Sequence, residues 1–166
     1  MTALHSFLIF AFASLLLYAA FCDIRRFEIP TAVPVALLLL YPIFAASASA
    51  PASAFAAVAV ALAVFGGGVL LYARGWLGAG DVKLLAAASL WVGPGHCVDF
   101  VSLTAMAGGV LAAILLTRLG RAAFALLRAP GTDHQACLKG FRRPMPFGVA
   151  ITAAALVTVL QPILSE

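Results

Sequence analysis

Two aspartates stand out in a chain that has only six acidic residues. Asp81 lies in the stretch GAGDVK (78–83), between glycines and a lysine at the start of an apolar run, and Asp23 follows the first apolar run. Two carboxyl groups that share one water molecule can hydrolyse a peptide bond. Close together they do not both ionise, so one retains a proton. The ionised group then deprotonates the water while the protonated group polarises the scissile carbonyl.

The composition predicts that lipid, not water, surrounds the elements that carry these aspartates. Of the 166 residues, 64% are hydrophobic and 10% are charged, and the mean hydropathy is +1.12. A water-soluble domain of this length cannot bury so many apolar side chains. At about 20 residues per membrane span, the chain has room for roughly five to seven helices. We therefore expect an all-α polytopic membrane protein with a single transmembrane domain, 1–166.

Hydropathy predicts six transmembrane helices. The first lacks the basic start and small-residue cleavage site of a signal peptide, so it is interpreted as a retained membrane helix. The six segments lie at roughly 3–22, 31–47, 53–73, 76–94, 98–117 and 146–164.

The basic residues predict the orientation of these helices. Arg25 and Arg26 follow the first segment, Arg74 and Lys83 flank the link between the third and fourth, and the other six lie between the fifth and sixth. If the chain crosses the membrane six times, all ten therefore fall on the same side. That side is cytoplasmic by the positive-inside rule, and both termini lie on the outer side. The net charge of +4 then reports membrane orientation and predicts no nucleic-acid partner. Residues 118–145 are predicted to form a basic cytoplasmic loop, either an irregular one or an interfacial extension of the fifth helix.

This six-helix topology brings Asp23 and Asp81 to the same depth in the membrane. Gly93 and Pro94 end the fourth helix, so it reaches across the roughly 30 Å hydrocarbon layer only if it extends back towards Trp76. Asp81 then lies below the membrane surface, where a carboxylate is costly and is a functional candidate.

Each aspartate also has a purely structural interpretation. Asp81 has the position of an N-cap for the fourth helix. Asp23, beside Arg25 and Arg26, is by itself more typical of a structural charge at a helix end. The pairing at one depth favours the catalytic interpretation. The glycines before Asp81 support it, because they keep the backbone thin enough for an extended peptide to approach.

Three motifs resemble those of the type IV prepilin peptidases, a family of membrane aspartyl proteases. GAGDVKLLAA (78–87) resembles the family's G-x-G-D motif, CDIRRFEIP (22–30) the segment around its first aspartate, and PMPFGVAI (144–151) the motif that opens its last helix. The resemblance covers essentially the whole chain. The compact form, without a methyltransferase domain, is similar to the Tad/Cpa-type peptidases that process Flp pilins and pseudopilins.

The resemblance implies a role for several residues. Asp23 and Asp81 become the catalytic pair, and Gly78 and Gly80 the motif glycines. The accessory motif positions are Lys83, Pro146, Phe147 and Gly148. Thr31 departs from the family, which usually has asparagine there, so any amide role at this position is in doubt.

The implied function is removal of the short basic leader of a prepilin at the cytoplasmic face of a bacterial inner membrane, commonly after glycine. No cofactor or metal is implied. The chain lacks the paired C-x-x-C motifs associated with N-methylation, so we expect peptidase activity alone. The expected partners are the prepilin substrate and the lipid bilayer.

One non-catalytic alternative remains open from the residues. In a small transporter or pilus-assembly subunit, Asp81 and Lys83 would form a structural or ion-binding pair, and such proteins often break helices at glycines near a buried charge. Proteases of other mechanisms are disfavoured, because the chain has neither H-E-x-x-H nor G-x-S-x-G.

Overall fold

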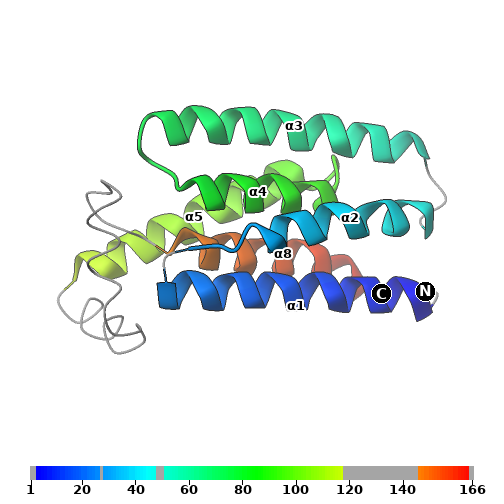
Figure 1. Ribbon diagram of the computed structural model, residues 1–166, viewed down its shortest axis with the longest axis horizontal. Helices are drawn as coiled ribbons and strands as arrows, with labels where there is room; N and C mark the ends of the chain where they lie inside the picture. The colour runs from blue at the N-terminus through cyan, green and yellow to red at the C-terminus, as the bar shows by residue number, and fades with distance from the viewer. Residues whose placement is uncertain (1–2, 27, 48–50, 118–145, 165–166) are drawn as a thin grey trace.

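The computed structural model describes residues 3–26, 28–47, 51–117 and 146–164, so the predicted basic loop at 118–145 lies outside the described residues. The described ranges form α-helices and contain no strand, as expected for an all-α protein. The helices run back and forth as a bundle (Figure 1). They are α1 (Ala3–Arg26), α2 (Ala32–Ser47), α3 (Pro51–Ala73), α4 (Ala79–Val92), α5 (Cys97–Leu116) and α8 (Phe147–Leu164).

Helix α1 continues one turn beyond its predicted end at residue 22, so Asp23 lies inside the helix. The charged residues at its end do not break a helix. The helical conformation is instead disfavoured at Ile29, because Pro30 follows it. The chain turns there, with the Val33 N–H donating to the Pro30 carbonyl at 3.0 Å, and α2 begins at Ala32.

Helix α4 is shorter than the predicted 76–94. Its 14 residues rise only about 21 Å, less than the roughly 30 Å hydrocarbon layer. A short helix is tolerated here because α4 is enclosed by α2, α3, α5 and α8, and nine of its residues are buried. Gly93, with a φ of 77°, ends it in a conformation that favours glycine.

An aromatic cluster fixes α4 near the end of the bundle that holds the chain termini. The Trp91 indole N–H donates to the Leu37 carbonyl of α2 at 3.0 Å. The Trp91 ring stacks on Phe12 of α1 at 4.9 Å and packs against Phe44 of α2 at 4.8 Å. One side chain therefore joins three helices.

Glycines bring other helices into close contact. A Cβ atom at Gly68 of α3 would lie 2.9 Å from Cγ1 of Val82 on α4, and one at Gly108 of α5 would overlap the ring of Phe147 on α8. Close approach at small residues is a common basis of helix association in lipid.

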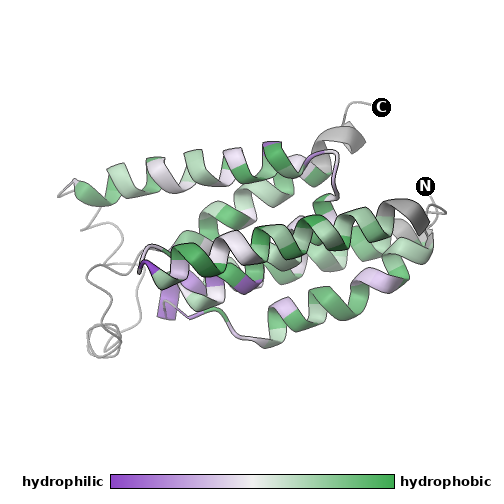
Figure 2. Cartoon of the chain, turned by 90° about the horizontal axis from the view of Figure 1, so that it is seen from above, coloured by the Kyte–Doolittle hydropathy of each residue, from purple (hydrophilic) through white to green (hydrophobic). Residues whose placement is uncertain are grey.

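The outer surface of the bundle is apolar. Three described helices are long and apolar enough to cross a membrane: Ser6–Arg26, Ala54–Ala73 and Cys97–Leu116. Large hydrophobic side chains are exposed on them, including Phe10, Phe55 and Met106. Figure 2 shows hydrophobic residues along most of each helix, with the deepest hydrophilic colour gathered at the end opposite the chain termini. These are features of a membrane protein. That all six helices span, with both termini outside, stays a prediction.

Candidate active site

The two predicted aspartates lie at one end of the bundle. Asp23 is in the last turn of α1 and Asp81 is in the first turn of α4. Helix α8 also begins there, with Gly148 in its first turn. The N-terminal end of α1 and the C-terminal end of α8 lie at the opposite end (Figure 1).

Asp23 is held by the start of α8. Its carboxyl group is buried, and Oδ2 accepts a hydrogen bond from the Gly148 N–H at 2.7 Å. The first N–H groups of a helix have no partners within it, so they form a natural binding site for a carboxylate. A Cβ atom at residue 148 would lie 2.8 Å from Oδ2, so any residue larger than glycine would displace the Asp23 carboxyl group.

Asp81 is held by the start of its own helix. Gly78 is the N-cap residue and Asp81 is the third helical residue, so the alternative in which Asp81 itself is the N-cap is wrong. Its buried carboxyl group accepts a hydrogen bond from the Gly78 N–H at 3.2 Å through Oδ2. A Cβ atom at residue 78 would lie 2.7 Å from that oxygen. The hydrogen bond that caps α4 therefore engages only one of the two carboxyl oxygens of Asp81.

The two carboxyl groups lie near each other in the fold. The Ile29 side chain contacts both Gly80, which precedes Asp81, and Gly148, whose N–H binds Asp23. Among the described residues, no basic side chain forms a salt bridge with either carboxyl group. Lys83 is exposed, and residues two apart on a helix do not face each other, so Asp81 and Lys83 do not form the pair that the transporter alternative needs. Two buried acids without a countercharge favour a shared proton.

The remaining motif positions have structural roles around this pair. Pro146 is buried, and its carbonyl accepts the Val149 N–H at 3.3 Å. Phe147 packs against Gly108 and so attaches the start of α8 to α5. Thr31 is exposed at the start of α2.

Sequence reasoning missed the role of Ile29. This half-buried side chain lies in the link between α1 and α2 and contacts Gly80 on one side and Gly148 on the other. The signal was present as Ile-Pro after Asp23, but which helices it contacts depends on the tertiary fold. The hydrogen bond from Gly148 to Asp23 joins residues 125 apart and was missed for the same reason.

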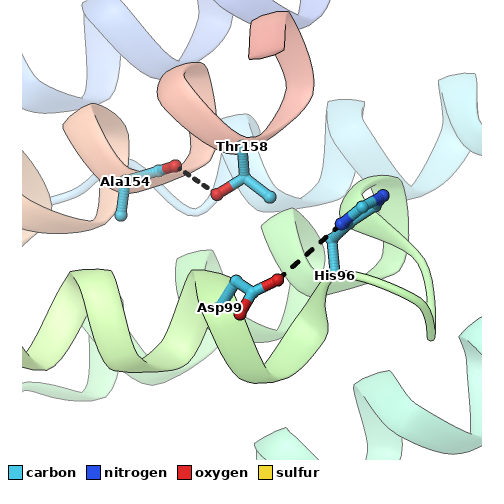
Figure 3. Close-up of polar contacts among 4 residues, drawn as sticks. All are labelled: His96, Asp99, Ala154 and Thr158. Atoms are coloured by element: carbon cyan, nitrogen blue, oxygen red, sulfur yellow. Dashed lines mark hydrogen bonds and ion pairs between the residues drawn. The ribbon is translucent and has the colours of Figure 1, made fainter. Parts of the chain in front are cut away.

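The opposite end of the bundle has different chemistry. Oδ2 of Asp99 lies 3.8 Å from Nδ1 of His96, and both side chains are largely exposed (Figure 3). The Thr158 hydroxyl near them donates to the Ala154 carbonyl within α8. Among the residues described, no group of three or more His, Cys, Asp or Glu side chains is arranged to hold a metal ion.

Comparison with known proteins gives one match. The model of the type IV leader peptidase family matches residues 10–113, a stretch that includes both aspartates. Neither curated proteins nor solved structures gave a significant match. The matched stretch is more than half of the chain, and the chain therefore belongs to the type IV leader peptidase family.

Proposed function

We propose that this protein is an aspartyl endopeptidase that removes the short basic leader of Flp-type prepilins or pseudopilins. The observation that carries the proposal is the pair of buried carboxyl groups, Asp23 and Asp81, at one end of the bundle. Membership of the type IV leader peptidase family supports a leader peptide as the substrate.

We further propose that the protein lies in the inner membrane of a bacterium, with the site on the cytoplasmic side. Arg25, Arg26 and Arg74 lie at the end of the bundle that holds the aspartates. Basic residues are retained on the cytoplasmic side during membrane insertion. A basic leader is retained there for the same reason, so enzyme and leader would meet on one side.

In the proposed mechanism, the two aspartates share one proton. The ionised carboxylate takes a proton from water while the water oxygen attacks the scissile carbonyl carbon, and the protonated carboxyl group donates to the carbonyl oxygen. The tetrahedral intermediate collapses as the carboxyl group that took the water proton gives it to the leaving nitrogen. A hydroxyl group of the intermediate returns its proton to the other carboxylate, which restores the starting state of the pair. The Gly148 and Gly78 amides each bind one carboxyl oxygen, which orients the other oxygens towards the water.

Cleavage of a co-expressed Flp-type prepilin, followed by gel mobility, tests the proposal. We expect Asp23→Asn and Asp81→Asn each to abolish the shift to mature length, because an amide can neither take nor give the required proton. Asp99→Asn is the matched control, because Asp99 is exposed at the opposite end of the bundle.

The control variant should process the prepilin at the wild-type rate, with all variants present at equal levels in the membrane. Processing that persists in either Asp23→Asn or Asp81→Asn would exclude the aspartyl mechanism. Prepilin that stays at full length with the wild-type protein would instead favour the transporter or assembly-subunit alternative.

A further inference from the structure

We propose that Ile29 is a positioning residue whose side chain sets the gap between the two carboxyl groups; this inference rests on the proposed function. Ile29 belongs to neither helix that carries an aspartate. It lies in the link after α1, and its half-buried side chain packs against the hydrophobic core.

Ile29 contacts one glycine at the base of its side chain and another glycine at the tip. On one side, a methyl group added at Gly80 would lie 3.2 Å from Cβ of Ile29 and 3.6 Å from its backbone nitrogen. On the other, a methyl group added at Gly148 would lie 3.1 Å from Cδ1 of Ile29. The side chain therefore occupies the space between the start of α4 and the start of α8, and glycine on both sides permits it to fit.

Each of these glycines is linked to one of the two aspartates, one through the peptide chain and one through a hydrogen bond. Gly80 precedes Asp81 in the chain, and the Gly148 N–H holds Oδ2 of Asp23. A change in the separation of the two glycines therefore changes the separation of the two carboxyl groups. Isoleucine suits a spacer because branching at Cβ restricts its χ1 rotamers.

Two substitutions should move the carboxyl groups in opposite directions. Ile29→Val removes only Cδ1, the atom facing Gly148, and lets α8 approach α4. Gly80→Ala adds a methyl group against Ile29 and pushes α4 away. Ile151→Val is the matched control for the first, because Ile151 is a fully buried core residue of α8 and loses the same methyl group. Gly66→Ala is the control for the second, since a Cβ atom there meets nothing within 4 Å.

The first measurement is the pH dependence of kcat for purified enzyme in detergent, acting on a synthetic peptide that spans a prepilin leader junction. Closer carboxyl groups repel each other more, so the two limbs of the pH profile should separate in Ile29→Val and converge in Gly80→Ala. We expect kcat at the optimum to fall roughly tenfold in both, with KM unchanged, because misplacing a reacting group reduces rate more than binding. The two control variants should keep the wild-type profile.

A second measurement is independent of activity. With Cys22, Cys97 and Cys137 replaced by alanine and both aspartates kept, cysteines are placed at positions 79 and 149, next to the two glycines that Ile29 contacts, and the rate of oxidative cross-linking is followed. The rate should rise at least twofold with Ile29→Val and fall with Gly80→Ala. Unchanged cross-linking, or profiles that change equally in Ile151→Val, would overturn the inference. A wild-type enzyme that fails to cleave would refute the proposed function while leaving the cross-linking result to decide on the spacer.

Discussion

A buried carboxylate is costly unless hydrogen-bond donors replace the water it has lost. Asp23 and Asp81 each accept a hydrogen bond from a backbone N–H group at the start of a helix. A neutral donor leaves each carboxyl group free to change its protonation state, whereas a salt bridge would hold it ionised. The glycines that supply these donors are therefore part of the site even though they have no side chains.

Gly148→Ala tests this at a single residue. The added Cβ would lie 2.8 Å from Oδ2 of Asp23, too close for the hydrogen bond to keep its geometry. A displacement of the carboxyl group by about 1 Å can cost about 100-fold in rate, so we expect kcat for leader cleavage to fall on that order. Ile29→Val should not restore activity, because the overlap with Asp23 remains.

Gly109→Ala is the matched control for Gly148→Ala. A Cβ atom at residue 109 meets nothing within 4 Å, and alanine is the better helix former by about 1 kcal/mol. Its cleavage rate should equal that of the wild type. Comparable losses in the two variants would show that the effect at residue 148 comes from general damage to the helices.

The burial of Asp23 and Asp81 at one end of the bundle could be predicted from the sequence, because each carboxylate stands at an end of an apolar run, where it is costly. The motifs also marked Gly78 and Gly148, but not that their N–H groups bind the carboxyl oxygens, and Ile29 was not marked as a spacer. Gly148 and Ile29 act through neighbours that are distant in the chain, so their contacts depend on the tertiary fold.

At the scale of helices, hydropathy predicted the order and type of the described elements. It was wrong at the ends of α1 and α4. A hydropathy pattern records where lipid lies, so it ends α1 at its first charge, whereas the helix continues to Arg26. It also assigns α4 a full membrane length that an enclosed helix does not need.

Helix packing can be tested at the contact between α3 and α4. Gly68→Ala would place a methyl group 2.9 Å from Cγ1 of Val82, a stiff β-branched side chain. Overpacking of this kind costs about 1–3 kcal/mol. We expect a lower melting temperature in detergent, measured by the loss of helical circular dichroism.

Two further variants complete the test of this contact. Gly66→Ala, two residues away on α3 with open space around it, should melt at or slightly above the wild-type temperature. Val82→Ala combined with Gly68→Ala should recover part of the loss, because it removes the overlapping methyl groups. A melting temperature for Gly68→Ala equal to that of Gly66→Ala would mean that α3 and α4 are not tightly packed there.

At the scale of the whole molecule, the two ends of the bundle are chemically different. The end with the aspartates also holds Arg25, Arg26 and Arg74, while Asp99 and His96 lie at the other. Between the ends, the surface is apolar and exposed. Helix α4 is shorter than α1 and α3, and it is enclosed rather than in lipid. The aspartate at its start is therefore held between longer helices.

This asymmetry makes the orientation testable by labelling with a membrane-impermeant maleimide on intact cells. In a background free of the natural cysteines, Gly95→Cys reports on the link between α4 and α5, and Arg74→Cys on the link between α3 and α4. Both positions are exposed. Because basic residues stay in the cytoplasm, we expect Gly95→Cys to react in intact cells and Arg74→Cys to react only after permeabilisation.

Leader cleavage by each variant verifies that it is folded. Reaction of both cysteines from one side would mean that α4 does not cross the membrane. The opposite pattern would put the carboxyl pair on the outer face, where a leader retained in the cytoplasm could not reach it.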